Sequence, residues 1–132
     1  MARFVIDLEA ALRLLDEEAA PAAAHRILAP SLLRSQVPDA LYGRVRRGET
    51  SREAALRANA RFAKAKHRYL GDAVLRRRAF ELALRLDMAS TFDAEFIALT
   101  QLQGDALIAG NAELAAVARK VVTVRPFKDL FG

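Results

Sequence analysis

The sequence of 132 residues contains no cysteine. This absence excludes disulfide bonds, cysteine-based zinc sites, thiol catalysis and iron–sulfur clusters. No apolar run approaches the roughly 20 residues that a membrane-spanning helix needs. The opening segment reaches an acid, Asp7, before a signal-peptide core can form. We therefore expect a cytoplasmic protein that does not associate with membranes.

Internal repeats, low-complexity linkers and nucleotide-binding glycine loops are also missing. Because the chain has neither a Gly-x-Gly-x-x-Gly nor a Walker-type motif, we favour other functions over that of a small nucleotide-binding α/β domain. A chain of this length buries about two-thirds of its unfolded surface, which is enough to fold without a metal or a disulfide. We expect a single domain over residues 1–132.

Acidic residues are fewer than basic ones, with 16 Asp and Glu against 21 Lys and Arg and a formal charge of +5. The excess lies in the middle of the chain, at 44–78, where basic residues far outnumber acids. Such a distribution is typical of solvated helix faces, and equally of a surface that holds a phosphate backbone or an acidic partner. Both interpretations stay open at this stage.

Short apolar runs alternate with helical patterns along the chain. The runs predict strands at 3–6, 26–29, 69–70, 106–109 and 121–124, with a tail at 126–132. The periodicity and capping residues predict helices at 8–18, 31–47, 51–68, 72–86, 90–103 and 111–119. Continuous apolar strands that alternate with helices are typical of a parallel sheet covered on both faces. The expected fold is α/β, a three-layer α/β/α sandwich with a short, mostly parallel central sheet.

Four polar residues stand where these strands end or where neighbouring helices begin, and sites in parallel sheets form beyond the carboxyl ends of the strands. Asp7 follows the first strand and Asn111 follows the fourth, and either could simply cap the next helix. Asp93 suits the first turn of its helix, where the helix dipole favours a carboxylate. Gln36 could be a partly buried amide. Taken one at a time, each of these four residues can be explained by its role in local structure.

Together these residues make the chain resemble the PIN domain family, in particular the VapC-like toxin ribonucleases of toxin–antitoxin pairs. The resemblance covers nearly the whole chain and is most specific in TFDAEFIALT at 91–100, GDALIA at 104–109 and NAELA at 111–115. The segments FVID at 4–7 and APSLLRSQV at 29–37 also match. It implies a PIN-like domain that hydrolyses RNA phosphodiesters with Mg²⁺ or Mn²⁺. It also implies a cognate antitoxin protein as partner and a homodimer.

The family's cleavage site takes acids from four separate places in the chain. Asp7 and Asp93 match two of them, and the resemblance makes them catalytic residues and metal ligands. The other two positions hold the amides Gln36 and Asn111, the latter in Ala-Gly-Asn at 109–111 where the family has Thr-x-Asp. The resemblance thus implies a metal site with two acids and two amides.

Two missing charges matter because Mg²⁺ is a hard cation that binds oxygen ligands and lowers the pKa of a bound water. Each lost charge weakens the attraction by about 1–4 kcal/mol at short range, and a neutral amide cannot act as a general base. We therefore expect weak metal binding and reduced or absent cleavage. Glu9 and Glu113, two residues after Asp7 and Asn111, could compensate by turning toward the ion, or both could face solvent.

The helix expected at 51–68 carries a basic stripe with spacings of four, three and four residues. The basic stripe consists of Arg57, Arg61, Lys64 and Arg68. It could contact RNA or an acidic antitoxin segment, or be a solvated helix face. Phe62 is expected in the core, and His25 and His67 at the surface rather than as ligands.

Two functions remain. The first is a metal-dependent endoribonuclease, the toxin of a toxin–antitoxin pair, attenuated by its amides. The second is a catalytically degenerate PIN-like module that binds RNA or a protein partner and cleaves nothing.

Overall fold

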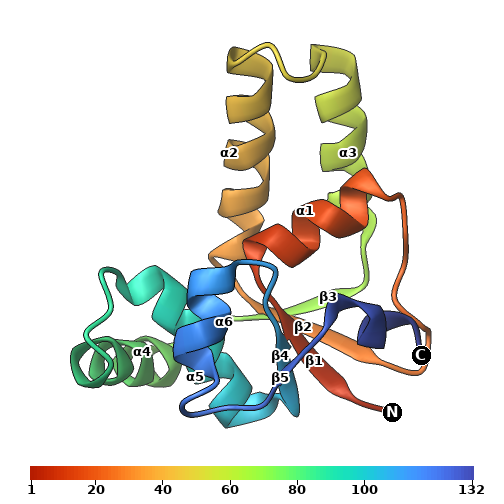
Figure 1. Ribbon diagram of the computed structural model, residues 1–132. Helices are drawn as coiled ribbons and strands as arrows, with labels where there is room; N and C mark the ends of the chain where they lie inside the picture. Colours follow the sequence, from red (N-terminus) through yellow and green to blue (C-terminus); the bar gives the residue numbers. More distant parts are fainter.

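The structure, a computed structural model, describes residues 1–132 and is built around a five-stranded sheet (Figure 1). Its strands are β1 (Arg3–Ile6), β2 (Arg26–Pro30), β3 (His67–Leu70), β4 (Ala106–Ile108) and β5 (Val124–Arg125). The helices are α1 (Leu8–Asp16), α2 (Leu33–Arg46), α3 (Arg52–Lys64), α4 (Ala73–Arg85), α5 (Thr91–Gln103) and α6 (Ala112–Ala118), followed by a short 3-10 helix, η1 (Phe127–Phe131).

The strand order is β3-β2-β1-β4-β5, and every neighbouring pair is parallel. Helix α5 packs against β1, β2 and β4 and is itself covered by α4, whereas α1 packs against α2 and α3. The expected three-layer α/β/α sandwich is confirmed, with a sheet that is parallel throughout. Because all strands run the same way, their carboxyl ends share one edge of the sheet, the carboxyl edge, and their amino ends share the opposite edge, the amino edge.

The middle of the sheet forms the core. Val5 and Ile6 of β1 and Leu107 of β4 are completely buried, as expected for strands that are covered on both faces. Helix α5 is buried continuously from Phe96 to Thr100, and the Thr100 hydroxyl donates a hydrogen bond to the Phe96 carbonyl at 2.8 Å. This satisfied polar group lets α5 cross the core without an unpaired hydroxyl.

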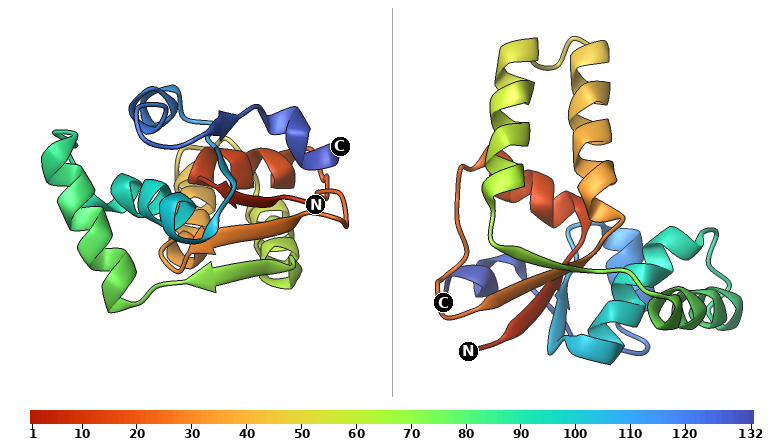
Figure 2. Two further views of the ribbon diagram at one scale, coloured as in Figure 1. Left: turned by 90° about the horizontal axis from the view of Figure 1, so that it is seen from below. Right: turned by 180° about the vertical axis from the view of Figure 1, so that it is seen from behind.

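Helices α2 and α3 form an antiparallel hairpin that projects away from the sheet (Figures 1 and 2). In α2, Leu33, Val37 and Leu41 are buried. Pro38 lies inside this helix. None of the helices combines the length and the apolar character that crossing a lipid bilayer requires.

The boundary between α3 and β3 differs from the prediction. The helix ends at Lys64 rather than at residue 68, because Ala65 adopts an extended backbone conformation. The strand β3 accordingly begins at His67 and is longer than the expected 69–70. Ser51 caps α3 by accepting a hydrogen bond from the Ala54 N–H at 3.0 Å.

The C-terminal region differs more. The strand expected at 121–124 begins only at Val124, because the N–H groups of Val121 and Val122 both donate to the Ala118 carbonyl and close the end of α6. The strand β5 is confined to Val124–Arg125. The expected tail contains η1, whose Leu130 is fully buried.

Candidate active site at the carboxyl edge

Asp7 lies at the carboxyl end of β1 and is only 2% exposed. Its Oδ1 accepts hydrogen bonds from the N–H groups of Ala10 at 2.8 Å and Gly110 at 3.0 Å, and its Oδ2 accepts one from Asn111 at 3.0 Å. The carboxylate therefore caps α1 and also holds the turn between β4 and α6. Hydrogen bonds to a charged group contribute about 1.5–3 kcal/mol each, so Asp7 stabilises the fold as well as forming the site.

The turn approaches α1 closely because position 110 is glycine. A Cβ at Gly110 would lie 2.7 Å from the Cβ of Glu9 and 3.1 Å from the backbone nitrogen of Ala10. Any larger residue would push the turn away from α1 and lengthen the hydrogen bonds to Asp7. Gly110 thus contributes to the site through its missing side chain, directly before Asn111.

Asn111 caps α6, which confirms one of its two expected roles, helix cap and metal ligand. Its Oδ1 accepts a hydrogen bond from the Leu114 N–H at 2.9 Å. An amide oxygen has two acceptor positions, so one remains free on Asn111. The cap and a metal-ligand role are therefore compatible at this residue.

Asp93 lies in the first turn of α5, behind the N-cap Ser90. The pKa of its carboxyl is raised, first by partial burial and then by the negative charges of Asp7 and Glu113. Those two charges come from the end of β1 and from α6, so three separate segments bring carboxylates together at the carboxyl edge. No cationic side chain contributes to the pKa of Asp93.

Gln36 occupies the first turn of α2, directly after the carboxyl end of β2, the strand that pairs with β1. Its Oε1 is buried and accepts no hydrogen bond. A buried acceptor without a donor costs about 1–3 kcal/mol. This unused carbonyl oxygen suits a cation or a hydrogen-bond donor supplied from outside the chain.

The two acids considered as compensating ligands differ in their surroundings, although both are exposed. Glu113 contributes to the raised pKa of Asp93 and so belongs to the same group of charges. Glu9 acts instead on Arg44 of α2, whose pKa is raised above all by its hydrogen bond to Asp16 and to a smaller extent by Glu9. Glu113 is thus the acid that lies in electrostatic reach of the site.

A metal ion at the carboxyl edge would have to be held by carboxylate, amide and water oxygens together. No group of three or more His, Asp or Glu side chains is close enough to bind a metal ion alone. A carboxylate offers about four acceptor positions, and Asp7 uses three of them for backbone N–H groups. Asp93 and the Oε1 of Gln36 would have to supply much of the remaining coordination, with water completing it as Mg²⁺ prefers.

The basic stripe does not form one helix face, which corrects the expectation. Arg57, Arg61 and Lys64 lie on α3 and are exposed, whereas Arg68 lies on β3. Arg61 is already engaged, since its Nη2 donates to the Leu15 carbonyl at 3.1 Å. Because α3 ends just before β3 begins, Lys64 lies toward the amino edge of the sheet. Contact of these residues with RNA or a partner stays a prediction.

The two histidines are not free surface residues, contrary to expectation. His25 accepts a hydrogen bond from the Ala2 N–H at 3.2 Å through Nδ1, and its Nε2 is buried without a partner. Burial lowers the pKa of His67 to about 4, and its ring packs edge-on against Phe62 and Tyr69. Phe62 is buried as expected.

Comparison with known proteins bears on the architecture. No protein-family model matches the sequence, and no curated protein matches it. Among solved structures, the crystal structure of PAE2754 from Pyrobaculum aerophilum superposes with a TM-score of 0.71 over 93% of this chain and 90% of that chain. The two chains share one fold. Their sequences are 20% identical, so the likeness carries no statement about activity.

Proposed function

We propose that the chain is a PIN-like, metal-dependent endoribonuclease of the VapC-like toxin type, with attenuated activity. The observation that carries this proposal is the position of Asp7, Asp93 and Glu113 at the end of β1, in the first turn of α5 and in the first turn of α6, where the charges of Asp7 and Glu113 add to burial in raising the pKa of Asp93. Carboxylates that repel one another without a nearby cationic side chain destabilise a fold. A bound divalent cation would offset that repulsion, which gives the grouping a physical purpose.

The metal, when bound, would neutralise charge on an RNA phosphate and lower the pKa of a water. Asp93 is the ligand with its acceptor positions free, since no hydrogen bond to it is formed within the chain. Asp7 would add one remaining acceptor position while keeping α1 and the turn before α6 in place. The amides Gln36 and Asn111 would add carbonyl oxygens but no charge.

Attenuation follows from the same residues. Two amides cannot accept a proton from an attacking water, and they weaken the electrostatic attraction for the ion by about 1–4 kcal/mol per missing charge. The exposed basic residues Arg57, Lys64 and Arg68 lie on α3 and at the start of β3, and their contact with RNA stays a prediction. The antitoxin partner, the homodimer and the cytoplasmic location remain predictions that rest on the resemblance to the family.

An RNA cleavage assay with Mg²⁺ or Mn²⁺ tests the proposal. We expect slow cleavage by the native chain, none by Asp93→Asn, and at least tenfold faster cleavage by the double variant Gln36→Glu/Asn111→Asp, since one restored charge is worth about 1–4 kcal/mol. The matched control is Asn59→Asp/Gln103→Glu, which makes the same chemical changes on α3 and at the end of α5. Cleavage that is unchanged in Asp93→Asn would contradict the proposal.

A second function, a degenerate module that binds RNA or a protein and does not cleave, is favoured by one observation. The side-chain oxygens of Asp7 and Asn111 already serve as helix caps. In that case the native chain binds RNA or its partner without cleavage, and only the Gln36→Glu/Asn111→Asp variant cleaves. Failure of both proteins to cleave any RNA would remove support for the metal site itself.

A further inference from the structure

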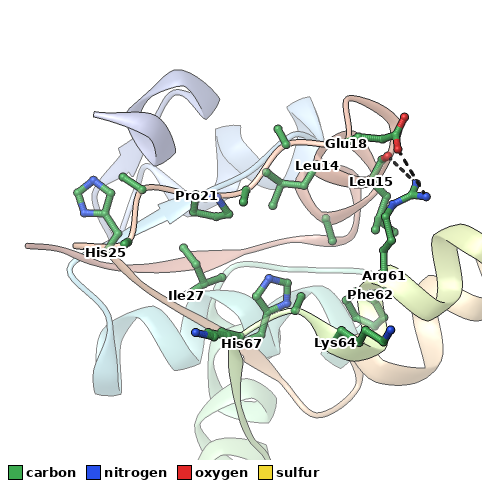
Figure 3. Close-up of a pocket in the computed structure, with 17 residues that line it drawn as sticks. Leu14, Leu15, Glu18, Pro21, His25, Ile27, Arg61, Phe62, Lys64 and His67 are labelled. Carbon is green, nitrogen blue, oxygen red and sulfur yellow. Dashed lines mark hydrogen bonds and ion pairs between the residues drawn. The ribbon is translucent and has the colours of Figure 1, made fainter.

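A cavity of about 620 Å³ opens at the amino edge of the sheet, away from the carboxyl edge that holds Asp7 (Figure 3). It lies between the second half of α1, the segment 19–25, the start of β2, the end of α3 and the start of β3. Its volume is within the usual range of about 300–1,000 Å³ for small-molecule sites. None of the candidate metal-site residues lines it.

One wall of the cavity is unusually apolar for a surface segment. The connection between α1 and β2 reads Ala-Ala-Pro-Ala-Ala-Ala at 19–24, without a single polar side chain. Surface connections are normally rich in polar residues. In Figure 3, Pro21 on this wall faces Ile27 and His67 across the slot. Buried Leu14 and Phe62 add further hydrocarbon surface.

The opposite wall is cationic. Arg61, Lys64 and Lys66 line it from the end of α3 and the start of β3, and Glu18 is the acid among the lining residues. Glu18 lies 3.8 Å from Arg61, while neither lysine has a carboxylate within 4.0 Å. His67 stays neutral near pH 7 because burial lowers its pKa to about 4. The two lysines therefore present unpaired positive charge beside an apolar slot.

We propose that this cavity binds an amphipathic carboxylate, with a hydrocarbon chain against the alanine and proline wall and the carboxylate at Lys64 and Lys66. Burial of hydrocarbon contributes about 25 cal/mol per Å², and the two lysines fix the orientation of the anionic end. A nucleotide suits the cavity less well, because a base needs hydrogen-bond partners for its edges and the walls offer mainly methyl groups. The inference stands apart from the ribonuclease proposal, since it uses no residue of the acid site.

Calorimetric and NMR titrations of the full chain with dodecanoate below its micelle concentration test this site. We expect saturable one-to-one binding, with shifts confined to the cavity residues. Dodecanol should bind at least tenfold more weakly than dodecanoate, as should dodecanoate to Lys64→Ala/Lys66→Ala. The matched charge control, Arg85→Ala/Arg119→Ala, removes two exposed cations that do not line the cavity and should bind like the native chain.

A second pair of variants tests the place of binding. Ala23 and its neighbour Ala24 are both exposed, but only Ala23 lines the cavity. Ala23→Trp should fill the slot and weaken binding at least tenfold, and Ala24→Trp should bind as the native chain does, with thermal unfolding used to confirm that both are folded. No saturable binding to the native chain, equal binding of dodecanol, or equal losses in the two tryptophan variants would overturn the proposal.

Discussion

Two aspartates of the candidate site differ in how they contribute to stability. Asp7 is buried and accepts three backbone hydrogen bonds. Asp93 is exposed at the surface, accepts none within the chain, and has its pKa raised by desolvation and by the charges of Asp7 and Glu113. The hydrogen bonds to Asp7 thus stabilise the fold, whereas Asp93 has no such bonds and lies near two like charges. Identical side chains differ here because their surroundings differ.

The variant Asp7→Asn should lower the free energy of unfolding by about 2–4 kcal/mol, because an amide weakens two hydrogen bonds and points donors at backbone donors. Asp93→Asn removes the same charge but should leave stability unchanged or slightly higher. Urea unfolding at pH 7 measures both. Equal losses in the two variants would show that the hydrogen bonds to Asp7 contribute little.

His67 should give unfolding a pH dependence. Its pKa falls from 6.5 to about 4 on folding because burial disfavours the charged ring. The unfolded chain therefore binds the proton more readily than the folded chain. The contribution of neutral, buried His67 to the free energy of unfolding is complete above pH 6.5 and is lost as the pH falls from 6.5 toward 4. The loss amounts to about 3 kcal/mol.

Urea unfolding at several pH values between 4 and 7.5 tests this expectation. His67→Phe should flatten the slope below pH 6.5 relative to the native chain, because the neutral ring of phenylalanine cannot be protonated. Parallel slopes for the two proteins would mean that the imidazole is solvated in the folded state.

At the scale of elements, the shortest pieces depend on tertiary contacts. Helix α6 has seven residues, η1 has five and β5 has two, lengths at which isolated helices and strands are unstable in water. η1 is held by fully buried Leu130, whose carbonyl accepts a hydrogen bond from the Ala22 N–H at 2.8 Å. The C-terminal segment therefore supports the connection that forms the apolar wall of the cavity.

We expect Leu130→Ala to destabilise the protein by about 2–5 kcal/mol, because it removes a completely buried side chain. Phe131→Ala, at a neighbouring position that is 40% exposed, should cost clearly less. Thermal and urea unfolding of the two variants give the comparison. A smaller loss for Leu130→Ala than for Phe131→Ala would mean that η1 does not anchor this end of the chain.

A strand is predictable from sequence where burial of its side chains stabilises it, and less so where backbone hydrogen bonds decide its position. The runs 3–6 and 106–109 were found because strands covered on both faces are continuously apolar. Val121 and Val122 are apolar and β-branched like the residues of those runs. Their N–H groups nevertheless bind a carbonyl at the end of α6 instead of a neighbouring strand. β3 was underestimated because its first residues are polar and pair through the backbone.

The same contrast holds for the site. The polar side chains at the strand ends were identified from sequence because side-chain chemistry and position are both visible there. The three backbone donors on Asp7 were not, because N–H groups carry no sequence signature beyond Gly110. The cavity at the amino edge has no sequence pattern of its own, since it depends on how the connection 19–24 lies relative to the end of α3.

For the whole molecule, added acids should couple stability to metal concentration. In a chelator, Gln36→Glu/Asn111→Asp should unfold at a temperature a few degrees below that of the native chain, because two more negative charges join Asp7 and Asp93. Millimolar Mg²⁺ should raise its unfolding temperature by more than it raises that of the native chain, since a ligand that binds only the folded state stabilises it.

Differential scanning calorimetry with and without Mg²⁺ checks this coupling. The control variant Asn59→Asp/Gln103→Glu should respond to Mg²⁺ like the native chain. An equal response of all three proteins would indicate that the cation does not bind among the carboxyl-edge residues.

The outermost strands of the sheet influence how the protein associates with others. β5 offers only two residues for backbone pairing, and β3 carries exposed Arg68 directly after the partly buried His67. Short or charged edge strands of this kind disfavour the addition of further strands and the growth of fibres. Assembly with another polypeptide is accordingly expected to proceed through helical surfaces rather than by extension of the β-layer.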